Sequence, residues 1–158
     1  MVHFVGAGPG APDLITRRGA ALLADADCII YAGSLVNPAL LGLAGPDCAI
    51  CNSAEMTLEQ VLAVMKENEA AHKTTVRLHT GDPCLYGAIQ EQMDALDARG
   101  VDYEVVPGVS SFCGAAAALR QEYLEAVRGN LRGQLNNISI QEKDGSITNL
   151  GEKYGRKK

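Results

Sequence analysis

The amino-acid sequence predicts an α/β fold with a mostly parallel sheet and helices on both faces, followed by an atypical polar tail. Short apolar segments alternate with helix-forming segments from Val2-His3-Phe4-Val5 onward. Strands buried on both faces are typically continuous apolar runs, and regular strand–helix alternation favours parallel pairing. Glycine-bearing turns, such as those at Gly6, Gly81 and Gly108, directly follow three of the apolar segments. Because ligands bind beyond the carboxyl ends of parallel strands, we expect these turns to crowd one edge of the sheet.

The predicted strands are short apolar segments that end at glycine or proline turns or lead into helical segments. They span residues 2–5, 28–31, 48–51, 74–78 and 103–106.

The predicted helices follow these strands along the chain. They span residues 13–24, a short segment at 38–43, a segment that begins at Thr57, residues 86–99 and residues 115–119. The start at Thr57 is the clearest, because Gln60 three residues later can complete a capping box. Val61 and Met65 then continue the buried stripe of this helix.

The character of the chain changes after about Tyr123. We expect an α/β domain over residues 1–123 and an atypical tail over 124–158 that is weakly structured or a hairpin. Ile138-Ser139-Ile140 alternates like an edge strand, and Asp144-Gly145 is a typical hairpin turn.

Composition and charge exclude several classes of protein. The net charge of −5 argues against general nucleic-acid binding. No apolar run approaches the ~20 residues that span a bilayer, and Met1 leads directly into the first strand without a secretory signal. We therefore expect a cytoplasmic protein without a membrane-spanning segment.

The five cysteines are odd in number and lie mostly in apolar segments, which favours buried free thiols. Cys48-Ala49-Ile50-Cys51 forms a C-x-x-C pattern, whose alternative interpretation is a metal or redox pair. Structural zinc sites need four ligands, and no second such pair accompanies it. We therefore predict no metal site.

The first glycine-rich turn, Gly6-Ala7-Gly8-Pro9-Gly10, limits the kind of ligand. It is not a P-loop, because no Gly-Lys-Ser/Thr follows. Its G-x-G-x-G spacing differs from the dinucleotide-binding pattern, and the second strand ends in Tyr31-Ala32-Gly33 without an acidic residue for a ribose. By itself, the turn could serve chain geometry alone.

Three ordered motifs give this turn a specific context. Gly6-Ala7-Gly8-Pro9-Gly10 with Asp13-Leu14-Ile15-Thr16 resembles the opening of the tetrapyrrole (corrin/porphyrin) methylase family. Arg77 to Pro83 with Leu85-Tyr86-Gly87, and then Val105 to Ser111, resemble that family's second and third signatures. Within the family, Tyr31 to Val36 and Leu78 to Pro83 are most similar to the branch that methylates precorrin-4 or cobalt-precorrin-4 at C11. The resemblance covers about residues 2–123.

The resemblance implies that S-adenosylmethionine, the methyl donor, binds largely through backbone groups between two α/β domains. The residues that match the family's motifs are the implied contacts: Pro9, Thr80, Gly81, Asp82, Leu85, Tyr86, Ser110 and Ser111. Asp82 has an alternative role as a turn- or helix-capping carboxylate, and Ser110 has one as the N-cap of the next helix. The structural and the binding roles can coexist.

The implied reaction is C11 methylation in cobalamin biosynthesis, in which a tetrapyrrole carbon attacks the methyl group of the sulfonium. The donor is already activated, and positioning alone can lower such a barrier by ~7–11 kcal/mol. We therefore assign no catalytic residue, and His79 is not interpreted as a general base. Arg17, Arg18 and Arg77 are candidates for a basic rim facing the substrate's carboxylates, or are ordinary surface cations.

The tail from Val127 onward resembles no part of the family, so we expect a truncated chain that carries one wall of the pocket. The alternative is a non-enzymatic remnant domain that self-associates or binds a partner. We expect the chain to form a homo-oligomer, specifically a dimer.

Overall fold

The computed structural model describes residues 1–120, 122, 139–141 and 147–149. By its internal contacts the chain divides into two compact units, Met1–Ala115 and Ala116–Lys158. The boundary expected between residues 123 and 124 stays a prediction.

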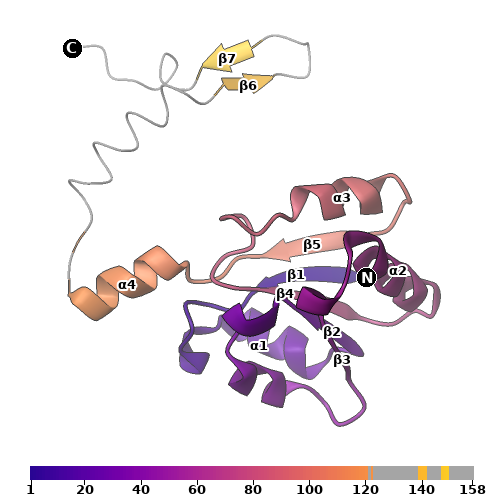
Figure 1. Cartoon of the computed structure of the whole chain (residues 1–158), viewed down its shortest axis with the longest axis horizontal. Coiled ribbons are helices and arrows are strands. Elements are labelled where there is room, and N and C mark those ends of the chain that lie inside the picture. Colours follow the sequence, from indigo (N-terminus) through magenta and orange to yellow (C-terminus); the bar gives the residue numbers. More distant parts are fainter. Residues whose placement is uncertain (121, 123–138, 142–146, 150–158) are drawn as a thin grey trace. The chain divides into compact units, whose positions relative to one another are not determined.

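The first unit is built on a five-stranded sheet in which every pair of neighbours is parallel (Figure 1). The strand order is β3-β2-β4-β1-β5, so β4 and β1 occupy the centre. This confirms the predicted α/β fold. The strands are β1 (Val2–Gly6), β2 (Cys28–Tyr31), β3 (Ala49–Asn52), β4 (Thr75–His79) and β5 (Tyr103–Val106).

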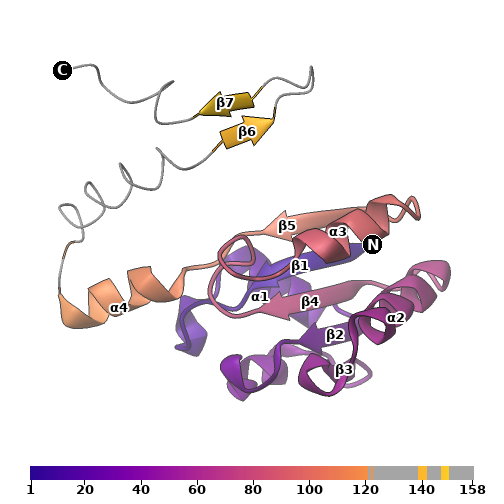
Figure 2. The same cartoon turned by 45° about the horizontal axis from the view of Figure 1, so that its top comes forward.

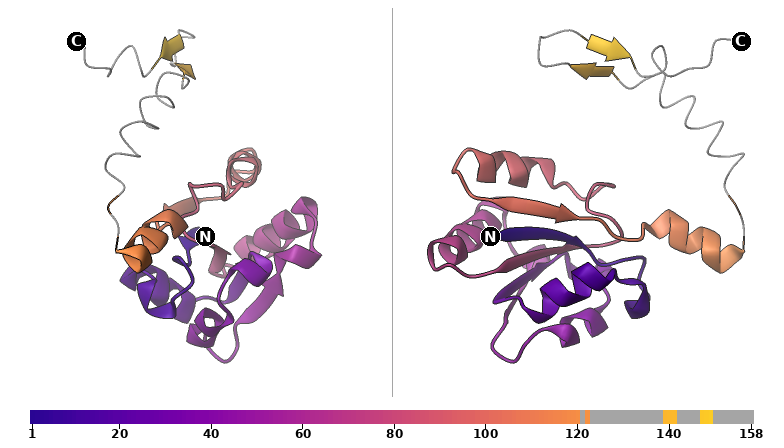
Figure 3. Two further views of the ribbon diagram at one scale, coloured as in Figure 1. Left: turned by 60° about the vertical axis from the view of Figure 1, so that its left-hand side comes forward. Right: turned by 180° about the vertical axis from the view of Figure 1, so that it is seen from behind.

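Helical segments cover both faces of this sheet (Figure 1, Figure 2 and Figure 3). On one face Leu23 of α1 (Arg17–Ala24) and Leu40 of η3 (Pro38–Leu43) pack with Val5 and Leu78. On the other face, the core is formed by α2 (Leu58–Ala70), α3 (Gln90–Asp97) and the opposite side chains of the strands. The two-sided cover explains why every residue of the two central strands, β1 and β4, is buried. The remaining single-turn helices are η1 (Pro12–Leu14), η2 (Gly33–Leu35) and η4 (Ser53–Glu55).

Helix α2 begins where the sequence predicts it. The Thr57 hydroxyl accepts from the Gln60 N–H at 3.3 Å, and the Gln60 side chain accepts from the Thr57 N–H at 2.8 Å. The capping box is therefore confirmed, with both free N–H groups at the helix start satisfied.

Two predicted helices begin later than expected. The segment 13–24 contains η1 and then α1, which begins after Thr16, whose hydroxyl accepts from the Gly19 N–H at 3.0 Å. The segment 86–99 is helical only from Gln90, because Tyr86 and Ala88 adopt left-handed backbone angles, φ 58° and 49°, that interrupt the helix. By contrast, α4 (Ser111–Leu119) begins four residues before the predicted 115.

In the second unit, β6 (Ser139–Gln141) pairs antiparallel with β7 (Ile147–Asn149). The turn expected at Asp144-Gly145 lies outside the described residues, as does most of the expected tail. In the parts of the chain that the structure describes, no helix is long and apolar enough to cross a membrane.

The cysteines are free thiols, as expected, but not all of them are buried. Cys84 and Cys113 are exposed, which corrects the expectation of buried thiols at these two positions. Cys84 follows the turn at Asp82, and Cys113 lies on an exposed part of α4. Cys28 is buried on the sheet beside Cys51, and burial raises the pKa of its thiol to about 11, so it stays protonated at neutral pH.

Candidate functional site

The loops that follow β1 and β4 are joined directly at the carboxyl edge of the sheet. Gly8 donates its N–H to the Gly81 carbonyl at 3.2 Å, and Gly81 donates back to the Gly8 carbonyl at 2.8 Å. Ala7 donates to the His79 carbonyl at 2.7 Å and so continues the pairing of the strands. The expectation that these turns crowd one edge is therefore confirmed.

The loop after β5 packs against the other two without room for side chains. A Cβ atom added to Gly108 would lie 2.1 Å from the Gly81 carbonyl oxygen and 2.8 Å from the Gly6 Cα. One added to Gly6 would lie 2.5 Å from the same oxygen. Three loops that are far apart in sequence thus meet through glycine backbones, an approach that only residues without a side chain allow.

The Asp82 side chain links the loop after β4 to the loop after β5 through hydrogen bonds. One carboxylate oxygen, Oδ1, accepts from the Cys84 N–H at 2.8 Å and so shapes the turn. The other, Oδ2, accepts from the Gly108 N–H at 3.0 Å. The turn-capping role considered for Asp82 is present, and it comes with a link between loops that sequence reasoning did not find.

Two hydroxyls at this edge are buried and have no hydrogen-bond partner among the residues that the structure describes: Thr80 Oγ1 and Ser110 Oγ. The Ser110 side chain is nearly inaccessible, with a residue exposure of 7%. Ser110 directly precedes α4, and its backbone carbonyl accepts from the Gly114 N–H at 3.0 Å, but its hydroxyl makes no capping hydrogen bond to a described residue. Buried polar groups normally have partners, so both hydroxyls fit contacts with a polar ligand.

Pro9 and Ser111 lie beside the same cluster. A Cβ atom added to Gly114 would lie 2.5 Å from the Pro9 Cβ, so the proline ring sits directly against the first turn of α4. One added to Gly81 would lie 3.3 Å from both the backbone nitrogen and the Oγ of Ser111. Gly114 gave no signal in the sequence, because a close approach to Pro9 is visible only in three dimensions.

The structure does not pack Leu85 and Tyr86 into this cluster. Both side chains are exposed, 47% for Leu85 and fully for Tyr86. They follow Asp82 on the segment that leads to α3, where the Leu85 N–H donates to the Asp82 carbonyl at 3.1 Å. Their predicted role in lining the pocket stays a prediction.

His79 is the last residue of β4, and its Nε2 is buried without a partner among the described residues. Burial, with a smaller contribution from Arg77, lowers the pKa of this imidazole to about 3. The ring is therefore neutral at physiological pH. It lies 6.1 Å from the Phe4 ring between centroids, a packing environment consistent with assigning it no general-base role.

The basic residues expected at a substrate-facing rim lie in three different environments. Arg17 is exposed. Arg18 forms an ion pair with Glu104, whose other oxygen contacts His3 Nδ1 at 2.7 Å. Arg77 is buried, with 8% of its surface exposed, so its assignment to a surface rim is wrong. It lies on a strand covered on both faces, and its guanidinium is held inside the core.

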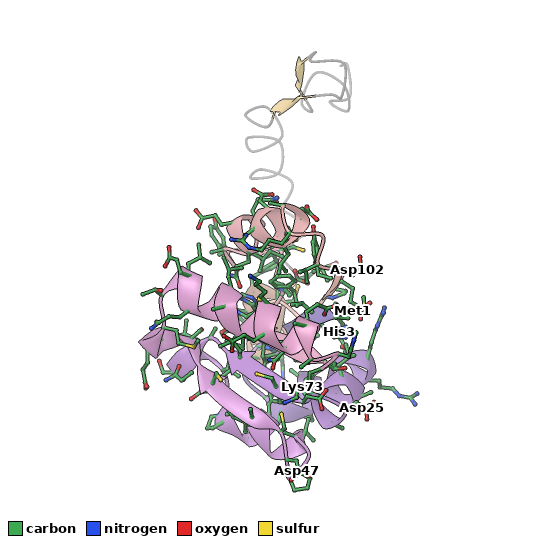
Figure 4. The ribbon with its side chains drawn as sticks, turned by 90° about the vertical axis from the view of Figure 1, so that its right-hand side faces the viewer. Met1, His3, Asp25, Asp47, Lys73 and Asp102 are labelled. Carbon is green, nitrogen blue, oxygen red and sulfur yellow. The ribbon has the colours of Figure 1, made fainter. Side chains whose placement is uncertain are left out.

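The opposite edge of the sheet carries none of the predicted site residues. Figure 4 looks onto this edge, where Met1, Lys73 and Asp102 lie just before β1, β4 and β5. In the described ranges, no group of three or more His, Cys, Asp or Glu side chains is arranged to hold a metal ion.

Comparison with known proteins places this chain in a family. The family model of the Tetrapyrrole (Corrin/Porphyrin) Methylases matches residues 1–128. The chain belongs to this family. Among curated members, it is 52% identical over 121 residues to the cobalt-precorrin-4 C(11)-methyltransferase of Methanocaldococcus jannaschii, covering 77% of this chain and 47% of that protein. It is 47% identical over 121 residues to the precorrin-4 C(11)-methyltransferase of Mycobacterium tuberculosis, covering 77% and 48%.

Solved structures of the family have the same fold. An X-ray structure of a cobalt precorrin-4 methyltransferase superposes with a TM-score of 0.75 at 47% identity, covering 77% of this chain and 51% of that one. A uroporphyrin-III C-methyltransferase from Thermus thermophilus, solved in complex with S-adenosylhomocysteine, gives 0.59 at 35% identity, covering 70% and 45%. The chain thus spans about half the length of the relatives it matches.

Proposed function

We propose that this chain provides the S-adenosylmethionine-binding part of a C-methyltransferase that acts on precorrin-4 or cobalt-precorrin-4 at C11 in cobalamin biosynthesis. The observation that carries the proposal is the identity of 43–52%, over 120 or 121 residues, to curated precorrin-4 and cobalt-precorrin-4 C(11)-methyltransferases. The match to the family model spans residues 1–128, which include all three motif loops. The proposed setting is the cytoplasm, and the proposed substrate is a tetrapyrrole.

The chemistry of the site fits the proposed methyl donor. S-Adenosylmethionine offers an amino-acid end, a ribose and an adenine, which need several hydrogen-bonding partners. The site provides the buried hydroxyls of Thr80 and Ser110, which have no partner in the described part of the chain, and a backbone without side chains at its glycines. A few fixed polar groups in an otherwise tight pocket are what orient a small ligand. The chain's own contribution would be to hold the donor in one orientation, with no covalent step on a side chain.

Isothermal titration calorimetry with S-adenosylhomocysteine tests this proposal on the full chain. We expect one ligand to bind per chain, and we expect Gly81→Val to weaken binding because any side chain there meets Ser111. Gly42→Val is the matched control, since an added Cβ at Gly42 meets nothing within 4 Å. Absence of binding at about 1 mM ligand, the level of a very weak complex, would contradict a donor-binding role for this chain.

A second candidate function is supported by the apolar surface of the first unit. Leu35 and Phe112, in segments that follow β2 and β5, are 72% and 54% exposed. Exposed apolar groups of this kind mark interaction surfaces when they are contiguous. The chain would then self-associate, as a homodimer, whether or not it binds the donor. Sedimentation velocity tests this: a stable dimer with no S-adenosylhomocysteine binding would favour an interaction domain over the methyltransferase part.

A further inference from the structure

Arg77 is a buried cation held only by neutral groups in the described part of the chain. Its Nε donates to Gln92 Oε1 at 3.2 Å, and its Nη1 donates to the Ile30 carbonyl at 3.1 Å. None of the ion pairs among the described residues involves it. Burial of a charge without a counter-charge is unfavourable for folding, so a buried arginine of this kind calls for a reason other than stability.

Gln92, on α3, contacts both Arg77 and the loop that precedes this helix. Arginine can only donate hydrogen bonds, so the side-chain oxygen of Gln92 must face it. The amide nitrogen must then point the other way, where it donates to the Ala88 carbonyl at 3.2 Å. Gln92 itself is 5% exposed and has little freedom to turn. Arg77 therefore fixes the orientation of the group that holds Ala88.

Ala88 is the last residue of the segment 83–88, whose backbone adopts conformations that are rare for residues other than glycine. Tyr86 and Ala88 are non-glycine residues with left-handed φ angles of 58° and 49°. Between them, Gly87 lies so close to Pro83 that an added Cβ would be 2.0 Å from the Pro83 carbonyl oxygen. Such conformations persist only where neighbouring structure holds them.

Hydrogen bonds hold this segment at both ends. At its N-terminal end, the Asp82 carboxylate accepts from the Cys84 N–H. At its C-terminal end, the Gln92 side chain donates to the Ala88 carbonyl.

We propose that Arg77 is a positioning residue for the donor site, acting through Gln92 on the Ala88 carbonyl to fix the segment that carries Leu85 and Tyr86. The inference rests on the proposed function for its consequence, since these two side chains are the ones expected to line the pocket beyond Asp82. It also assigns Arg77 a role away from the substrate's carboxylates, which a buried guanidinium cannot reach.

Gln92→Glu separates this role from simple stabilisation. At about pH 8 the new carboxylate is ionised, so it still accepts from Arg77 and adds an ion pair, but it has no N–H for the Ala88 carbonyl. We expect the melting temperature to hold or rise, while S-adenosylhomocysteine binds about tenfold more weakly, the factor for one lost hydrogen bond. Gln90→Glu makes the same chemical change at an exposed position of α3, where the lost N–H donates to Asp94 Oδ1 at 2.7 Å rather than to the Ala88 carbonyl, and we expect it to leave binding unchanged.

A second measurement reports on the segment without any ligand. Chymotrypsin cleaves after exposed aromatic residues in loosened chains. We expect Gln92→Glu to speed cleavage after Tyr86 and to leave cleavage after Phe112 unchanged as the internal reference. Arg77→Met is expected to do the same; if it does not fold, Gln92→Glu decides alone.

The outcomes distinguish the two proposals. Unchanged cleavage after Tyr86 in Gln92→Glu overturns the link from Arg77 to the segment. Faster cleavage with unchanged ligand affinity overturns the positioning role. If the wild-type chain binds no S-adenosylhomocysteine, the proposed function fails and the positioning role falls with it, while the cleavage rates still decide whether Arg77 and Gln92 hold Ala88.

Discussion

The Asp82 carboxylate joins the loop after β4 to the loop after β5, because its Oδ2 accepts from the Gly108 N–H at 3.0 Å while its Oδ1 accepts from Cys84. A single side chain thus holds two walls of the candidate site at a fixed separation. A donor-binding pocket needs such rigidity, since small shifts in a positioned ligand lower the rate of transfer.

Replacement of Asp82 tests this relationship. Asp82→Ala leaves two backbone N–H groups without their acceptor, and hydrogen bonds to charged groups contribute about 1.5–3 kcal/mol each. We expect the free energy of unfolding in urea to fall by about 2 kcal/mol or more, and ligand affinity to fall with it. Asp47→Ala, at an exposed position outside the candidate site, is the control. Equal stability of the two variants would mean that the Gly108 contact contributes little.

Gly108→Ala tests the close packing of the glycine loops. The added methyl group would lie 2.1 Å from the Gly81 carbonyl oxygen, a backbone atom that cannot move without displacing its loop. Overpacking of this kind costs about 1–3 kcal/mol or more, and we expect that loss in a chemical denaturation curve. Gly42→Ala, where the new methyl group meets nothing within 4 Å, should be close to neutral. A well-folded Gly108→Ala of wild-type stability would contradict the packing described for the three loops.

His79 predicts a pH dependence of stability. Burial lowers the pKa of its imidazole from 6.5 to about 3, so between these values the unfolded chain binds a proton that the native chain does not. The contribution of the neutral His79 to the free energy of unfolding is therefore fully present above pH 6.5. It decreases as the pH falls toward 3, by up to about 1.4 kcal/mol per pH unit. We expect His79→Gln to flatten this slope in urea titrations at several pH values, and His72→Gln, at an exposed histidine, to leave it intact. Identical slopes for wild type and His79→Gln would remove His79 as the cause.

Ser110→Ala separates binding from folding. The hydroxyl is buried without a partner among the described residues, so its removal should leave stability unchanged or slightly higher. If it contacts the donor, S-adenosylhomocysteine should bind about tenfold more weakly in calorimetry. Ser53→Ala is the opposite case: its hydroxyl donates to the Tyr31 carbonyl at 2.9 Å, so we expect about 1 kcal/mol of lost stability with binding preserved. Unaltered affinity in Ser110→Ala would exclude this hydroxyl from the site.

The sequence by itself determined the α/β class, the five parallel strands, the capping box at Thr57 and the edge at which the glycine turns gather. These features depend on apolar runs, local turn residues and contacts three or four positions apart, all of which can be read along the chain. The motif loops also carried the family resemblance, because their residues are close together in sequence.

Only the tertiary structure decided the contacts between polar residues and segments that are distant in the sequence. Arg77 reads as a surface cation in the sequence, yet it is buried because β4 occupies the centre of a sheet covered on both faces. The late start of α3 at Gln90 depends on Tyr86 and Ala88 being held in left-handed conformations by contacts with distant groups. Asp82 contacts Gly108, 26 positions away in the sequence, and Pro9 lies against Gly114, 105 positions away. Local pattern carries no information about such pairs, because the strand order that brings them together is set by packing of the whole domain.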